Sequence, residues 1–469
     1  MATERWGSRL GFLLATVGAA VGLGNIWRFS AVVGQNGGGA YLVPYLIAAV
    51  VCAIPLLVLE LSIGRRLRTD VVSAFQSIGS TYTPVGWFIT GAVLVILSYY
   101  LVLTGWVLGY LVAWLLGDPP TFAAFTTSWA PVGYFVVATA ITGAIVSAGV
   151  RAGIERMATL LMPTVFAILV VLAVYATTLS GWGTATRFLF TPEFAVLTHA
   201  DLWSAAVGQV FFSMSVGQGI MLTYGSYVDD GTDLRTAALV ITVVDVGAAI
   251  VAGLVIFPIV FSFGLEPTLG TELAFTTLPT AFETMQSGRL VAVAFFGLLL
   301  FAAISSAVSL LEVGVAATTD ATRLSRRGAT AALTGGVFLA GIPSALSYSP
   351  VDLAVAARPV LDVVDDSVGT FALPVSALLI VVVFVWVADL EEVAADLGLL
   401  APLVRYLIPV VLVAVTAARA AGVAVPAWRL LVDHADDGPF AVAVAVVAFA
   451  VLAGLGWLAR NRGSPPRRR

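Results

Sequence analysis

The chain has 469 residues, of which 60% are hydrophobic and 11% are charged, and its formal net charge is −4. This balance excludes a water-soluble globular protein of this length and indicates a polytopic, all-α membrane protein. The net charge is too small to predict an acidic or basic partner, so no nucleic-acid partner is expected. The basic residues are all arginine, and without lysine the chain offers neither a P-loop lysine nor a Schiff-base lysine.

Cysteine and histidine predict no catalytic or metal centre. Cys52 is the only cysteine, so no internal disulfide can form. His199 and His434 lie far apart, in or near expected loops, without metal-ligand spacing. No nucleophile–base pair stands out either, so we do not expect an enzyme.

Apolar segments long enough to cross a membrane recur along the chain, and we predict about twelve membrane-spanning helices. Their approximate bounds are 9–34, 37–63, 84–116, 131–149, 157–181, 203–227, 234–263, 288–318, 327–345, 367–389, 402–423 and 440–460. We assign residues 1–181 to a first repeat of five helices, 182–202 to an extracellular loop, 203–389 to a second repeat of five, and 390–469 to the last two helices and a basic tail. Because each repeat has an odd number of helices, the two repeats are expected to be inverted.

The distribution of arginine predicts the orientation. Most arginines fall on the side of the membrane that would also hold both termini. Such an excess is typical of the cytoplasmic side. We therefore expect a multi-pass protein of the cell membrane with both termini in the cytoplasm. The lipid bilayer is its surroundings, and no obligatory protein partner is inferred.

The first and sixth predicted helices are interrupted. Residues 18–25 read GAAVGLGN, and each glycine weakens a helix by about 1 kcal/mol relative to alanine. Residues 213–219 read SMSVGQG. Interruptions at matching positions of two repeats point to a substrate site. The freed carbonyls can ligate a hard cation such as sodium, and the freed N–H groups can bind a carboxylate.

A helix-packing role is the alternative for this glycine pattern. Gly18 and Gly22 form a GxxxG motif, which commonly allows two membrane helices to approach closely. Asn25 and Arg28 directly after the break favour a binding site instead, because polar groups inside a membrane span are costly.

The chain resembles the neurotransmitter:sodium symporter family, and within it the bacterial amino-acid transporters of the leucine-transporter type. The similarity extends over the first ten predicted helices. The motifs that carry it are GAAVGLGNIWRF (18–29), NGGGAYLVPY (36–45), SYYLVLTGW (98–106), LWSAAVGQVFFSMSVGQG (202–219) and LFAAISSAVSLLE (300–312).

The resemblance implies two sodium sites. One would comprise the Ala20 carbonyl and the side chains of Asn25, Ser213 and Asp245. The other would comprise the carbonyls of Gly18, Val21 and Ala302 and the hydroxyls of Ser305 and Ser306. A serine hydroxyl in a membrane helix often bonds only to the preceding turn, which is the alternative for both serines.

The resemblance also implies a site for an amino-acid substrate. Its carboxylate would meet the N–H groups of Leu23 and Gly24, the first sodium ion and the Tyr100 hydroxyl. Its amino group would face the carbonyls of Ala20, Phe212 and Ser213. The side-chain pocket would include Ile96, Phe212, Ser215, Gln218, Ser306 and Leu310. Gln218 stands where many relatives carry an aromatic residue, so the pocket is not expected to be entirely apolar.

Two gates follow from the same resemblance. On the outer side, Arg28 would pair with Asp365 through water, and Phe212 would cover the substrate. On the inner side, Asp320 and Tyr227 would meet an N-terminal arginine. The family places that arginine three residues before the tryptophan, where this chain has a threonine, so Arg5 would substitute for it. The alternative for Asp320 is a solvated loop charge.

Asp245 is the most informative departure from the family, whose members usually carry asparagine at this position. A lone carboxylate in a membrane span indicates function. Animal members use chloride to balance the charge of sodium, and we expect Asp245 to supply that charge itself. The sequence therefore predicts a sodium-coupled, chloride-independent symporter of an amino acid or related small zwitterion, working by alternating access. The alternatives are a proton-coupled carrier using Asp245 and a non-transporting sensor.

Overall fold

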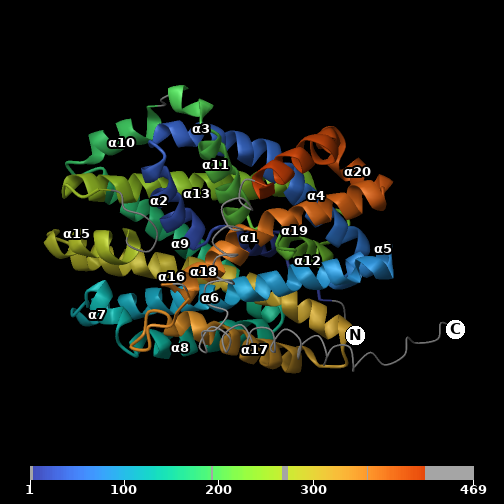
Figure 1. Ribbon diagram of the computed structural model, residues 1–469, viewed down its shortest axis with the longest axis horizontal. Helices are drawn as coiled ribbons and strands as arrows, with labels where there is room; N and C mark the ends of the chain where they lie inside the picture. Colours follow the sequence, from blue (N-terminus) through green and yellow to red (C-terminus); the bar gives the residue numbers. More distant parts are fainter. Residues whose placement is uncertain (1–3, 192–193, 267–272, 356, 418–469) are drawn as a thin grey trace.

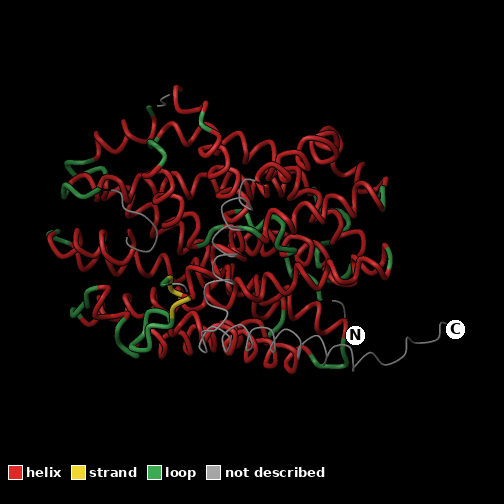
Figure 2. Tube along the Cα trace, in the orientation of Figure 1, coloured by secondary structure: helices red, strands yellow, loops and turns green. Residues whose placement is uncertain are grey.

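The computed structural model describes residues 4–191, 194–266, 273–355 and 357–417. Within these residues the chain is helical apart from loops and one short hairpin (Figure 2). The hairpin pairs β1 (Ala354–Val355) with β2 (Arg358–Pro359) in antiparallel register. An all-α membrane architecture satisfies each backbone hydrogen bond inside its own segment, as a bilayer requires.

The helices before residue 200 are α1 (Arg9–Ala20), α2 (Phe29–Gln35), α3 (Gly39–Ala48), α4 (Ile54–Leu67), α5 (Val71–Ile78), α6 (Thr83–Leu116), α7 (Phe122–Thr126), α8 (Ala130–Ser147), α9 (Arg156–Ala176) and α10 (Trp182–Phe190). The later helices are α11 (Ala200–Ser213), α12 (Ile220–Ser226), α13 (Leu234–Ser262), α15 (Leu278–Thr284), α16 (Gly288–Ala321), α17 (Arg326–Leu346), α18 (Val360–Val364), α19 (Ala372–Val381) and α20 (Glu391–Leu397). The long helices α6, α13 and α16 run along the long axis of the molecule, and α16 packs against α6 and α9 at its centre (Figure 1).

Side-chain caps fix where several helices begin. The Ser8 hydroxyl accepts a hydrogen bond from the N–H of Gly11 and starts α1. Asp70 and Asp233 likewise cap α5 and α13 with their carboxylates. Such caps satisfy N–H groups that the first helical turn leaves without partners.

Among the described residues, eight continuous helical segments are long and apolar enough to cross a membrane; several of them combine consecutive helices joined by short π-helical or 3₁₀ turns. They are Gly39–Leu67, Ser80–Leu116, Ala130–Ser147, Val150–Ala176, Leu234–Ser262, Gly288–Ala321, Arg326–Leu346 and Val360–Val387. Two bent pairs raise this number to ten. The predicted count of twelve is therefore not reached in the described part of the chain. The sixth predicted span is divided between α11 and the short α12, and the predicted span 440–460 lies outside the described residues.

Both predicted interruptions are confirmed. The first helix ends at Ala20 and resumes at Gly24 with a change of direction of 51°. The sixth ends at Ser213, and α12 begins at Ile220. Between them Ser215, Gly217 and Gly219 have φ angles of 54°, 80° and 69°, in the left-handed region that no α-helix can contain.

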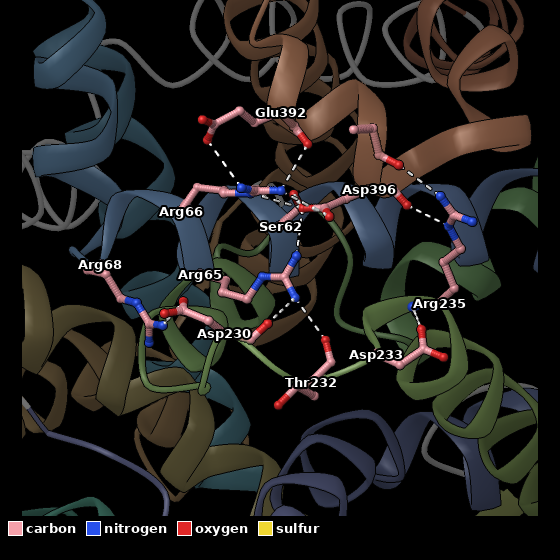
Figure 3. A network of polar contacts seen from close by, with 11 residues as sticks. Ser62, Arg65, Arg66, Arg68, Asp230, Thr232, Asp233, Arg235, Glu392 and Asp396 are labelled. Carbon is pink, nitrogen blue, oxygen red and sulfur yellow. Dashed lines mark hydrogen bonds and ion pairs between the residues drawn. The ribbon is translucent and has the colours of Figure 1, made fainter.

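Ion pairs gather at the end of the bundle that holds Trp6, which we call the Trp6 face; we call the opposite end the Arg28 face. At the Trp6 face, Asp396 of α20 forms an ion pair with Arg65 of α4 at 2.8 Å and accepts a hydrogen bond from the Ser62 hydroxyl at 2.5 Å (Figure 3). Arg235 at the start of α13 donates to the last carbonyls of α20. The network joins α4, α13 and α20, three elements that are distant in sequence.

Candidate functional site

The two interruptions meet through one buried polar cluster. The Asn25 side chain accepts from the N–H of Gly22 at 3.0 Å, which folds it back over the break. Its amide nitrogen lies 2.8 Å from the Ser213 hydroxyl and 2.7 Å from a carboxylate oxygen of Asp245. The Ser213 hydroxyl lies 2.8 and 2.9 Å from the two oxygens of Asp245. The predicted residues of the first sodium site on three helices therefore lie in direct contact.

The chemistry of this cluster suits a hard cation. All its ligating candidates are oxygens, and Asn25, Ser213 and Asp245 are at most 2% exposed. Asn25 and Ser213 both donate to Asp245, which is the arrangement an ionised carboxylate requires. A buried negative charge without a counter-charge is unfavourable, so a bound cation would stabilise the site. Ala20, whose carbonyl is the remaining predicted ligand, lines the adjacent cavity with Ser213.

The second predicted sodium set also lies together. The Ser305 hydroxyl is buried and has no hydrogen-bond partner among the residues that the structure describes, so it does not bond back to its own helix. A Cβ atom on Gly18 would stand only 2.2 Å from it, so the hydroxyl directly faces the Gly18 backbone. The Ser306 hydroxyl is 3.4 Å from the Gly18 carbonyl oxygen. Val21 and Ala302 are buried as well. A hydroxyl with no partner among the described residues, beside backbone carbonyls, fits a cation that bonds to oxygen.

A small cavity of about 30 Å³ lies between the two breaks. Its lining contains every predicted substrate-binding residue except Leu23, whose N–H is 3.4 Å from the Tyr100 hydroxyl. No side chain in the lining is charged. The lining residues are Ala19, Ala20, Gly22, Gly24, Ile96, Tyr100, Phe212, Ser213, Ser215, Gln218, Ser306 and Leu310.

At the Arg28 face, Arg28 contacts the predicted lid. Its guanidinium carbon stands 4.1 Å from the centre of the Phe212 ring, in a cation–π arrangement. Asp365 accepts a hydrogen bond from Tyr99 at 2.7 Å. Among the described residues no direct ion pair joins Arg28 to Asp365, so the water-mediated pair stays a prediction.

At the Trp6 face, Arg5 lies 3.6 Å from Asp229, and both side chains are largely exposed. The Asp320 carboxyl lies beside that of Asp70. The remaining predicted gate residue, Tyr227, donates to Glu312 at 2.8 Å. The predicted inner-gate residues are therefore near one face, but the structure does not join Arg5 to Asp320.

Sequence reasoning missed three buried side chains that support the site. Glu60 accepts from the N–H of Gly217 at 2.7 Å and so holds the second break. Gln209 donates to the Gly24 carbonyl at 2.8 Å. Glu312 forms an ion pair with Arg326 at 2.5 Å and also accepts a hydrogen bond from Tyr227. The signal was present, because Glu60 and Glu312 are carboxylates inside predicted spans, as Asp245 is.

Comparisons with known proteins identify the family. The model of the sodium:neurotransmitter symporter family matches residues 3–131 and 125–423. The uncharacterized sodium-dependent transporter YhdH of Bacillus subtilis is 35% identical over 80% of this chain and 86% of its own. An uncharacterized sodium-dependent transporter of Methanocaldococcus jannaschii is 33% identical over 82% of each chain.

A solved structure is similar over nearly its whole length. The crystal structure of MhsT in complex with L-phenylalanine superposes with a TM-score of 0.81 and 37% identity, covering 88% of this chain and 98% of that one. The predicted fold class, with its broken first and sixth helices, is confirmed. The chain is a sodium-dependent membrane transporter and belongs to the sodium:neurotransmitter symporter family.

Proposed function

We propose that the protein is a sodium-coupled symporter of neutral amino acids that works by alternating access around the two broken helices. The observation that carries the proposal is the buried contact between Asn25, Ser213 and Asp245 beside the cavity. Sodium bound there would contact the carboxylate of the substrate, so each would bind better in the presence of the other. Downhill entry of sodium then drives uptake.

Asp245 balances the charge of the sodium ion in this proposal. Its carboxylate is fully buried and accepts from two neutral donors, and no cation of the protein pairs with it among the described residues. A site that carries its own anion needs no chloride. Transport is therefore independent of chloride.

The substrate is an amino acid held by its backbone groups at the two breaks. Its carboxylate meets the N–H groups of Leu23 and Gly24 and the Tyr100 hydroxyl, at the positive end of a half-helix. Its amino group faces the carbonyls of Ala20 and Phe212. The similarity to a transporter solved with L-phenylalanine supports this class of substrate.

The Trp6 face is cytoplasmic in this proposal, and the Arg28 face is extracellular. The arginine clusters of α4 and α13 at the Trp6 face follow the positive-inside rule. The Trp6 indole donates to the Tyr224 carbonyl at 3.1 Å and closes this face. Phe212, beneath Arg28, closes the other.

The test is uptake of labelled neutral amino acids into liposomes that contain the purified protein. Gradients of sodium, potassium and protons are compared, with chloride or gluconate as the anion. We expect uptake only with inward sodium, equal in both anions. Uptake driven by protons alone would indicate the proton-coupled carrier, and sodium-dependent binding without uptake would indicate a sensor.

The variant Asp245→Asn tests the charge balance. We expect sodium-driven uptake in gluconate to fall about tenfold or more, because the amide lacks the negative charge that attracts sodium. Asp389→Asn, which removes an exposed carboxylate outside the cavity lining, serves as the matched control. Full chloride-free uptake by Asp245→Asn would refute the role of Asp245.

A further inference from the structure

The cavity between the breaks contains one polar side chain for which the described part of the chain supplies no hydrogen-bond partner. Gln218 lines the cavity and is 4% exposed. Its amide makes no hydrogen bond with any residue that the structure describes. Other polar side chains of the cavity wall have hydrogen-bond partners. Ser215 donates to the Ala19 carbonyl at 2.9 Å, and Ser213 donates to the Asp245 carboxylate at 2.8 Å. An amide that faces the cavity without a protein partner is left to water, so a ligand that supplies a partner gains affinity.

The backbone holds Gln218 in this position. Gly217 and Gly219 on either side have φ angles of 80° and 69°. Glu60 anchors the N–H of Gly217, and a Cβ on Gly217 would stand 2.8 Å from the Leu373 carbonyl oxygen. The segment is therefore tightly packed and pinned by a buried carboxylate. The fold therefore fixes the backbone at Gln218, and its side chain lies in the wall of the cavity.

The surroundings limit what can meet this amide. Ile96 and Leu310 are the apolar part of the same wall. No charged side chain lines the cavity, so a substrate with a charged side chain would be buried without a counter-charge. An amide offers both a donor and an acceptor, and it can therefore satisfy a hydroxyl or another amide.

We propose that Gln218 determines specificity, and that the preferred substrates are neutral amino acids with a short side chain that ends in a hydroxyl or an amide. This inference rests on the proposed function, because it assumes that the amino-acid backbone is held at the breaks. Polar substrates are then preferred over apolar ones of equal size, since an apolar side chain would leave the Gln218 amide unsatisfied.

The experiment measures sodium-dependent binding to the purified wild-type protein for isosteric pairs. Threonine is compared with valine, and asparagine with leucine, by competition against one labelled neutral amino acid. We expect the polar member of each pair to bind about 10- to 100-fold more tightly. Equal or tighter binding of valine and leucine would overturn the inference. Absence of sodium-dependent binding for every amino acid would instead overturn the proposed function.

Variants separate the amide from the shape of the pocket. Gln218→Met keeps the length of the side chain but removes the amide. The ratio of affinities for the polar and the apolar member of each pair should then fall to about one or reverse. Gln218→Asn keeps an amide and should retain part of the preference. Leu310→Met is the matched control, because it alters the apolar wall and should shift preference by size while leaving the polar-to-apolar ratio unchanged. A Gln218→Met protein with an unchanged ratio would contradict the role of Gln218.

Discussion

Replacing Asp396 by asparagine tests how strongly the polar network of the Trp6 face stabilises the fold. Its side chain is 16% exposed and receives Arg65 at 2.8 Å, Ser62 at 2.5 Å and Arg66 at 3.2 Å. Asparagine preserves the shape and one acceptor but removes the charge. Arg65, which is 10% exposed, would then donate to a neutral amide oxygen in place of the carboxylate, in addition to its bonds to backbone carbonyls such as that of Thr232.

The expected cost follows from these contacts. Hydrogen bonds to a charged group contribute about 1.5–3 kcal/mol and neutral ones about 0.5–1.5 kcal/mol, so each of the two buried bonds, from Arg65 and Ser62, loses about 1 kcal/mol. The half-exposed Arg66 adds less, because solvent screens it. The free energy of unfolding should fall by about 2–3 kcal/mol in total. Asp389→Asn breaks an exposed pair with Arg405 and should cost about 0–1 kcal/mol.

Thermal unfolding in detergent measures the difference. Cys52 is the only cysteine and is buried, so a thiol-reactive fluorogenic dye reports its exposure as the protein unfolds. The midpoint for Asp396→Asn should lie clearly below that of the wild type, and that of Asp389→Asn should lie close to it. Equal midpoints for the two variants would refute the reasoning that the buried network stabilises the fold more than an exposed ion pair.

Three further predictions use the same protein. Burial raises the pKa of Asp396, but the hydrogen bonds that it accepts outweigh this and hold the pKa below its ordinary value. The contribution of the Asp396 carboxylate to stability is therefore present above its unfolded pKa of about 4, and it is lost as the pH falls through the lower pKa of the folded state. The unfolding midpoint of the wild type should approach that of Asp396→Asn in acid, and a difference between the two midpoints that does not change with pH would contradict this. Gly217→Ala combines a φ of 80° with a Cβ 2.8 Å from the Leu373 carbonyl oxygen, and should cost at least about 1–2 kcal/mol by the same assay. Gly297→Ala, whose Cβ meets open space, should cost nothing, and equal losses would argue against strain and close packing at Gly217. Phe212→Leu should speed substrate release about 2- to 10-fold in dissociation experiments, and the effect should be non-additive with Arg28→Gln; additive effects would exclude a shared lid.

The sequence predicted the breaks and the residues around them because the signals there are local. Glycines cluster where the backbone must leave the helix, and Asn25 and Asp245 are polar groups that a membrane span does not tolerate without a function. The grouping of these residues into two sodium sets came from the family resemblance. The contact of Asn25 and Ser213 with Asp245 then required only that the broken helices meet.

The Trp6 face was predicted less well because its partners come from distant loops. Arg5 is exposed and contacts Asp229, and its range of conformations leaves nothing in the sequence to select one carboxylate. Asp396 and Ser62 are 334 residues apart in the chain, and neither stands in a recognisable motif. Such pairings depend on the arrangement of whole helices, which periodicity and composition do not specify.

The three left-handed residues of the second break have a mechanical consequence. A segment with Ser215, Gly217 and Gly219 at positive φ cannot become helical unless all three backbone torsions rotate through a barrier. In this structure it is a joint between α11 and α12 rather than a stretch of helix. In a transport cycle, α11 and α12 would move as two rigid helices about that joint. The hydrogen bond from the Gly217 N–H to Glu60 would couple movement of the joint to α4.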